Sequence, residues 1–207
     1  RLCRTADAIA YLSAHVGQRL KAQRMTNIPL IRLSHPPMTF GVPSPQPHDG
    51  PLRLLYFGRL LPYKGLDLLA DALVRLGPRP DLTVRIAGAG PEGPELAALG
   101  RMPNVTVENR WVPEQEVRDV LTWADALVLP YREASQSGVA AAALAAGRAV
   151  VATNVGGLAE QLRGADRALL CEPTADGLAA ALRTLLDNPP AATAAPADPA
   201  AAWRDMA

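Results

Sequence analysis

The chain has 207 residues, of which 49% are hydrophobic, and its 21 basic and 20 acidic residues leave a net charge of +1. Its length allows one or two domains with a sizeable core, and the near-neutral charge argues against a nucleic-acid binder, which normally carries a basic stripe. No apolar run approaches the ~20 residues of a membrane-spanning helix. Cys3 and Cys171 lie far apart, and we expect both to be free thiols.

The first 37 residues predict a strand, a helix and a second strand, at residues 8–12, 14–24 and 28–33. Residues 38–51 are rich in proline and show neither a helical nor a strand period, so we interpret them as a linker. The chain begins at Arg1 without a methionine or a signal peptide. We therefore expect it to be a fragment of a longer protein.

From residue 52 onward, short apolar strands alternate with helices. Strands are expected at 54–57, 82–87, 105–108, 126–129, 149–152 and 168–171, and helices at 65–76, 92–99, 113–123, 137–146, 157–163 and 175–186. Strands this apolar are typical of a parallel sheet with helices on both faces. Residues 52–187 are thus predicted to form a doubly wound α/β domain that binds its ligand at the carboxyl ends of the strands, near the switch point.

Residues 188–207 are rich in proline and alanine, and we expect a mobile tail. Trp203 near the end predicts the start of a truncated helix.

The first candidate site is the loop from Gly58 to Gly65, between a buried strand and a helix. Gly58 permits a sharp turn, and Arg59 and Lys64 then stand close to a helix N-terminus. Two cations and free helix N–H groups suit a diphosphate. An ordinary solvated loop, with Lys64 pointing at water, remains an alternative.

The second candidate runs from Glu133 through Gln136 to the start of an alanine-rich helix at Ser137, Gly138 and Val139. The N–H groups of these last three residues have no intrahelical acceptor and could grip an anion. A plain N-cap explains the serine. It does not explain Gly138, since glycine in a helix costs ~1 kcal/mol relative to alanine.

A third candidate is the glycine pair at 156 and 157, which precedes Glu160. Glu160 could bond a hydroxyl group, or it could simply occupy the first turn of a helix, where the macrodipole favours an acid.

A fourth pattern, from Gly88 through Gly90 to Gly93, spells G-x-G-x-x-G after a strand, and Glu108 follows 20 residues beyond Gly88. This is the dinucleotide-binding fingerprint. The helix that follows is short and the motif lies in the second βα unit, whereas the fingerprint normally opens its sheet. NAD(P) binding therefore stays open as an alternative.

In order, the blocks FGRLLPYKGLDLLADAL, LTVRIAGAGPE, NVTVENRWVPEQEV, ADALVLPY and SQSGVAAAALAAGRAVVATNVGGLAEQL resemble the C-terminal domain of family 4 (group 1) retaining glycosyltransferases. Residues 4–37 resemble the end of that family's N-terminal domain. The resemblance implies the GT-B fold, in which two Rossmann-like domains face each other and the C-terminal one binds the nucleotide-sugar donor. Residues 1–37 would then be a remnant of the acceptor-binding domain.

By position, the resemblance implies that Arg59 and Lys64 hold the diphosphate and offset the charge on the leaving group without a metal. The residues bordering the base would be Gly88, Gly90, Arg110 and Val112, and those contacting phosphate or sugar would be Gln136, Ser137, Gly138, Val139 and Glu160.

The family usually has two glutamates with seven residues between them, and these positions are Ala134 and Ala142 here. Glu133 adjoins the first and could act as the catalytic carboxylate. Ala142 cannot hold a ribose as the second glutamate does.

The resemblance predicts a bacterial hexosyltransferase that uses a nucleoside-diphosphate sugar and needs neither cofactor nor metal; three scattered histidines show no metal-ligand spacing. We expect a cytoplasmic protein, with peripheral membrane association of the full-length form left open, and an inactive fragment because the acceptor domain is missing. The alternatives are an NAD(P)-dependent oxidoreductase and a degenerate, non-catalytic nucleotide-binding module.

Overall fold

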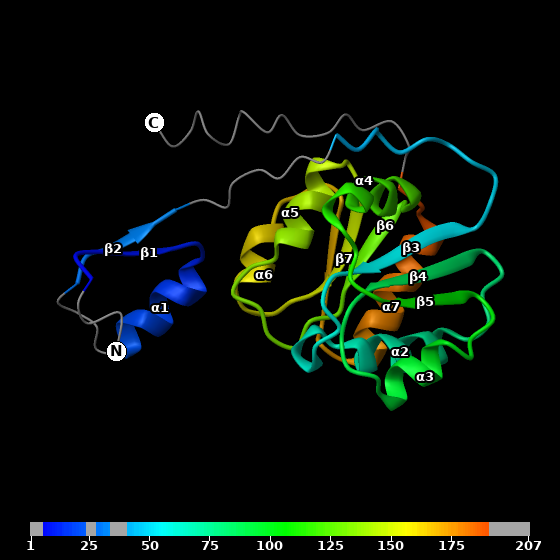
Figure 1. Ribbon diagram of the computed structural model, residues 1–207, viewed down its shortest axis with the longest axis horizontal. Coiled ribbons are helices and arrows are strands. Elements are labelled where there is room, and N and C mark those ends of the chain that lie inside the picture. The colour runs from blue at the N-terminus through cyan, green and yellow to red at the C-terminus, as the bar shows by residue number, and fades with distance from the viewer. Residues whose placement is uncertain (1–5, 24–27, 34–40, 191–207) are drawn as a thin grey trace.

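The computed structural model describes residues 6–23, 28–33 and 41–190, which contain a two-stranded and a six-stranded sheet (Figure 1). Cys3, Trp203 and the predicted tail beyond residue 190 lie outside these residues. Cys171 is a free thiol, and burial raises its pKa to about 11.

The six-stranded sheet is parallel throughout, with strand order β5-β4-β3-β6-β7-β8. Its strands are β3 (Leu52–Phe57), β4 (Leu82–Gly88), β5 (Val105–Asn109), β6 (Ala126–Leu129), β7 (Ala149–Thr153) and β8 (Ala168–Cys171). Every residue of β6 and β7 is buried, which explains their unbroken apolar sequence. The strand order reverses between β3 and β6, so the predicted doubly wound sheet is confirmed and its switch point lies there.

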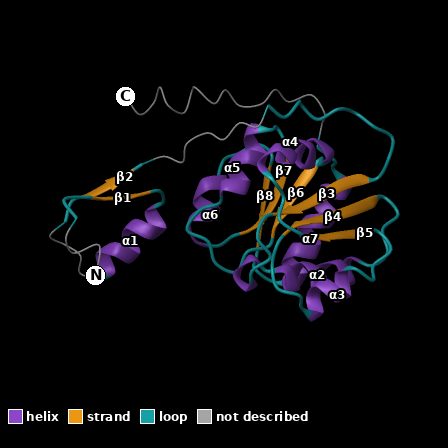
Figure 2. Ribbon diagram, viewed as in Figure 1, coloured by secondary structure: helices purple, strands orange, loops and turns teal. Residues whose placement is uncertain are grey.

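Three helices cover each face of this sheet (Figure 2). One core lies under α2 (Leu66–Leu76), α3 (Pro94–Leu99) and α7 (Ala175–Asp187), and the other under α4 (Glu114–Trp123), α5 (Gly138–Ala145) and α6 (Gly156–Leu162). The α3 helix begins two residues later than predicted, because Pro94 occupies its first turn. Among the described helices, none combines the length and apolar character needed to cross a membrane.

The N-terminal residues form the predicted strand, helix and strand, with shorter strands than expected. They are β1 (Ile9–Tyr11), α1 (Ala14–Ala22) and β2 (Leu30–Arg32), and the two strands pair in parallel. Ser13 caps α1 by accepting a hydrogen bond from the Val16 N–H group. This unit lies beside α6 (Figure 1).

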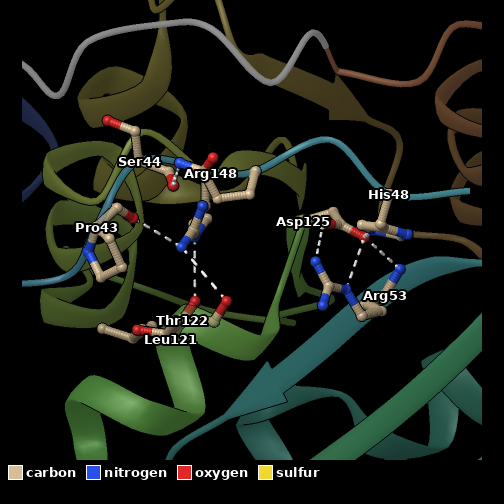
Figure 3. A network of polar contacts seen from close by, with 9 residues as sticks. Pro43, Ser44, His48, Arg53, Leu121, Thr122, Asp125 and Arg148 are labelled. Carbon is tan, nitrogen blue, oxygen red and sulfur yellow. Dashed lines mark hydrogen bonds and ion pairs between the residues drawn. The ribbon is translucent and has the colours of Figure 1, made fainter. Parts of the chain in front are cut away.

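The described part of the expected linker, residues 41–51, contains no helix or strand and is bonded to the amino edge of the large sheet. Arg148 is 1% exposed and precedes β7. Its guanidinium group donates to the main-chain oxygens of Leu121 (3.1 Å), Pro43 (3.0 Å) and Thr122 (3.4 Å) (Figure 3). A buried guanidinium group thus joins the linker to α4.

A second contact at this edge centres on Asp125, which precedes β6 (Figure 3). Its Oδ1 accepts from Arg53 Nη2 (2.9 Å), and its Oδ2 lies 2.8 Å from the Arg53 backbone nitrogen and 2.9 Å from His48 Nε2. Burial alone would raise the pKa of Asp125, but the hydrogen bonds from Arg53 and His48 hold it below its ordinary value. The amino edge is therefore a paired, structural network.

Candidate functional site

Loops that are far apart in the sequence meet at the carboxyl edge of the large sheet. A Cβ atom added at Gly88 would lie 1.8 Å from the Gly58 oxygen, and one added at Gly58 would lie 3.6 Å from Cγ2 of Val139. The Gly157 N–H group donates to the Ala134 oxygen at 2.9 Å. The loops after β3, β4, β6 and β7 are thus in contact, and the loop that carries Arg59 and Lys64 adjoins the start of α5, on the same side of the fold.

A short 3-10 helix, η2 (Pro62–Lys64), places the Lys64 side chain and was not expected from the sequence. It ends at Gly65, whose φ of +69° lies in the left-handed region. A Cβ atom at this position would lie 1.8 Å from the Pro130 oxygen. Only glycine allows both this conformation and this close approach, so Gly65 fixes the loop against the end of β6.

Lys64 and Arg59 bring positive charge to this edge without a balancing carboxylate. Arg59 is exposed, Lys64 is half-buried, and neither forms an ion pair with another described residue. Burial, and to a smaller extent the nearby charge of Arg59, lowers the pKa of Lys64 to about 8. Burial deprives the charged Lys64 ammonium group of water, so a bound anion would supply the favourable interaction that it lacks.

Tyr131 connects Lys64 to α5 and was missed by the sequence reasoning. Lys64 Nζ lies 3.8 Å from the centroid of the Tyr131 ring, a cation–π distance. The Tyr131 hydroxyl lies 3.3 Å from Ser137 Oγ, and only 1% of Tyr131 is exposed. Its place two residues after the buried strand β6, next to Pro130, was the available signal.

The start of α5 has the predicted small residues. One of the three predicted N–H donors there is already bonded, and two are not. Ser137 is the N-cap, and its Oγ accepts from the Ala140 N–H group at 3.2 Å. Its own N–H group donates to Gln161 Oε1 at 2.9 Å, so it is already engaged. The N–H groups of Gly138 and Val139 precede any intrahelical acceptor. These two are the donors left for an anion.

A pocket of about 540 Å³ opens between these loops and α1. Lys64, Glu133 and Gln136 line it from the large domain, and His15 and Arg19 line it from α1. The Oε1 atom of Gln136 is buried and has no hydrogen-bond partner. Glu133 Oε1 accepts from Arg19 Nη1 at 2.8 Å, and both side chains are largely exposed. The pocket thus offers cations, a carboxylate and an unsatisfied amide oxygen.

The residues predicted to border a base lie on the outer strands of the same edge. The Gly90 N–H group donates to Asn109 Oδ1 at 3.0 Å, which joins the loops after β4 and β5. Arg110 pairs with Glu116 at 2.6 Å, and Val112 is buried. Trp111, which lies between Arg110 and Val112 in the turn predicted to border the base, is 72% exposed.

The glycine pattern after β4 has a local explanation. At Gly88, with a φ of +155°, and at Gly90, a Cβ atom would lie within 1.8 Å and 2.2 Å of the main-chain oxygens of Gly58 and Leu60. These glycines let two loops pack together, so the pattern requires no dinucleotide.

The side chains of Glu160 and Ala142 are not open to a ligand. Glu160 Oε2 accepts from the Ala14 N–H group at 2.7 Å, and Glu160 Oε1 pairs with Arg32. Ala142 is 4% exposed and lies in the core. Both carboxylate oxygens of Glu160 are therefore engaged by the N-terminal unit.

Comparison with known proteins places these features in a family. Residues 51–188 match the sequence model of the family described as "Glycosyl transferases group 1". The chain is 34% identical over 199 residues to a glycogen synthase of Mycobacterium tuberculosis, covering 92% of this chain and 48% of that protein. It thus spans about half the length of this curated relative.

Solved structures share the fold. A sucrose-phosphate synthase from Thermosynechococcus elongatus superposes with a TM-score of 0.75 at 21% identity, covering 91% of this chain and 51% of the other. The C-terminal domain of a group 1 glycosyl transferase from Francisella tularensis gives 0.57 at 22% identity, covering 72% and 78%. The family match confirms the expected family, and the solved structures confirm the expected fold. Neither comparison favours the oxidoreductase alternative.

Proposed function

The chain belongs to the group 1 glycosyltransferases, and from that premise we propose that residues 52–187 bind a nucleoside-diphosphate sugar at the carboxyl edge of the large sheet. The observation that carries the proposal is the meeting of Arg59 and Lys64, both without ion-pair partners among the described residues, with the start of α5. Cations beside free helix N–H groups form an anion site.

In this proposal, Arg59 and Lys64 bind the diphosphate, and the N–H groups of Gly138 and Val139 bond its oxygens. As the bond to the sugar breaks, negative charge builds on the departing nucleoside diphosphate. Two fixed cations stabilise that charge in the transition state more than in the ground state. The proposed reaction therefore proceeds without a metal, and we propose retention at the anomeric carbon from the family resemblance alone.

Glu133 and Gln136 are proposed to meet the sugar. Both line the pocket next to Lys64. The Oε1 atom of Gln136 is buried without a hydrogen-bond partner, so a rotation of the amide toward the pocket would let it accept from a sugar hydroxyl. The outer loops, with Gly88, Gly90, Arg110 and Val112, are proposed to border the base. Because the chain spans about half the length of the glycogen synthase it matches, we propose that the acceptor binds largely outside it and that the 207-residue chain binds donor without transferring it.

Titration calorimetry tests this proposal. The 207-residue chain is titrated with UDP and GDP, and with a hexose conjugate of each. We expect one of the two nucleotides and its hexose conjugate to bind, and Arg59→Ala and Lys64→Ala each to weaken binding about tenfold. Arg118→Ala, which removes an exposed arginine of α4, is the matched control and should leave the affinity unchanged.

Heat from none of these nucleotides, or unchanged affinity in both variants, contradicts the proposal. A non-catalytic nucleotide-binding module is the second candidate, favoured by the alanines at positions 134 and 142. Donor hydrolysis by the full-length protein separates the two.

A further inference from the structure

The N-terminal unit is held against α6 by a carboxylate. Oε2 of Glu160 accepts a hydrogen bond of 2.7 Å from the backbone N–H group of Ala14, the first residue of α1. Oε1 of Glu160 pairs with the guanidinium group of Arg32, at the end of β2. One side chain of the large domain thus reaches both a helix and a strand of the N-terminal unit.

The charges at this contact are complementary. The first turn of α1 contains no acidic residue, so the positive end of its macrodipole has no carboxylate of its own. Glu160 supplies one from another element, and its side chain is only 27% exposed. The side chain of Arg32 is 56% exposed, so the partly buried bond to the Ala14 N–H group is the stronger of the two links.

The backbone beneath this contact is shaped to admit it. A Cβ atom at Gly157 would lie 2.6 Å from Ser13 Oγ and 1.8 Å from the Ser135 oxygen. At Gly156, where φ is +47°, it would lie 3.4 Å from Cδ2 of His15. The nearest atoms at both glycines are main-chain oxygens of the loop before α5, since a Cβ atom at Gly156 would also lie 2.3 Å from the Ala134 oxygen. The glycine pair therefore lets the start of α6 approach both that loop and the N-terminal unit.

A second link lies farther along α1. Arg19 pairs with Glu133 at 2.8 Å, but the two side chains are 62% and 67% exposed. Exposed ion pairs contribute little stabilisation, so the Arg19–Glu133 pair adds little to the docking of the N-terminal unit that Glu160 provides.

We propose that Glu160 is a positioning residue that docks the N-terminal unit on the large domain and thereby places His15 and Arg19 of α1 on the wall of the pocket that contains Lys64. The docking rests on contacts within the chain, and only the use of that wall by a nucleotide sugar rests on the proposed function. Glu160 is then part of the scaffold and does not bond the donor.

Hydrogen exchange of the 207-residue chain tests the docking. Glu160→Leu removes the acceptor and the charge, and Glu160→Gln removes the charge alone. Exchange of the amides of α1 should be about tenfold faster in Glu160→Leu, with a smaller increase in Glu160→Gln. The control is Glu114→Gln, an exposed glutamate in the first turn of α4.

Amine modification gives a second readout, because the chain has only two lysines, Lys21 and Lys64. Lys21 is exposed on α1 and is the internal reference. If α1 leaves the pocket wall in Glu160→Leu, the rate of acetylation at Lys64 should rise relative to that at Lys21.

The same α1 exchange in Glu160→Leu as in the wild type would overturn the proposal. If exchange rises in β4 as well, the substitution has loosened the whole fold, and Glu160→Gln, which keeps the size of the side chain, then decides. Faster exchange confined to α1 and β2 in that variant supports docking, and unchanged exchange overturns it. No nucleotide is present, so the outcome does not depend on whether the donor proposal holds.

Discussion

The two edges of the large sheet use cations in opposite ways. At the amino edge, Arg53 pairs with Asp125, and the buried Arg148 donates to main-chain oxygens. At the carboxyl edge, Arg59 and Lys64 lie beside a helix start with no ion-pair partner among the described residues. Cations that form hydrogen bonds or ion pairs within the fold help to hold it together, whereas Arg59 and Lys64, for which no such bond is found among the described residues, are available to a ligand. Substitutions at one edge should therefore change stability, and those at the other should change binding.

The largest expected effect is at the amino edge. Asp125→Ala leaves Arg53 and His48 without their shared acceptor, so we expect a loss of about 3 kcal/mol in the free energy of unfolding, measured with urea. Nucleotide affinity should not change. Asp119→Ala, at an exposed site on α4, is the control and should stay within about 0.5 kcal/mol of the wild type.

The same carboxylate should give an acid dependence. Because the pKa of Asp125 is lowered in the folded protein, the unfolded chain binds more protons as the pH falls. The stabilisation is complete above the unfolded pKa of about 4 and is lost as the pH drops through the folded value. Asp125→Ala should lack this part of the acid dependence. Equal acid dependence in both proteins would contradict the assignment.

At the carboxyl edge, a rise in pH should weaken nucleotide binding but increase the stability of the fold. The pKa of Lys64 is lowered to about 8, so affinity for a nucleotide sugar should fall as the pH rises through this value, by up to about tenfold. Over the interval from about 8 to 10.5 the unfolded chain holds more protons at this site, so stability should rise. In Lys64→Met both trends should be absent, and calorimetry and urea unfolding at pH 7 and 9 measure them.

The smallest expected effect comes from the side chain under Lys64. Tyr131→Phe keeps the ring that faces the ammonium group, whereas Tyr131→Leu removes it. We expect nucleotide affinity to fall about threefold in the leucine variant and to remain close to that of the wild type in the phenylalanine variant. Burial raises the pKa of Tyr131 to about 12, so its hydroxyl stays neutral in both pH series. Equal affinities in the two variants would show that the ring does not position Lys64.

The fold was predictable because its signals are local. The unbroken apolar run of β7 and the strand–helix alternation set the sheet class, and the order of the motifs indicated the family. The meeting of the Lys64 loop with α5 followed from the rule that parallel strands present their carboxyl ends at one edge.

The contacts of Glu160 and Tyr131 could not be predicted in the same way. Glu160 bonds Ala14, a residue 146 positions away in the sequence, and Tyr131 meets Lys64 only because η2 turns toward β6. Each contact depends on the relative position of elements that no period or spacing encodes. The sequence also did not reveal that Gly88 and Gly90 allow the close packing of the loop after β3.

A nuclear magnetic resonance titration with a nucleotide sugar tests the central claim most directly. The account predicts that the amide signals of Gly138 and Val139 and the side-chain signals of Lys64 shift together along one saturating curve, while the Arg53 signals at the opposite edge stay in place. Saturating shifts confined to Arg53 and its neighbours, with Gly138 and Lys64 unchanged, would contradict it.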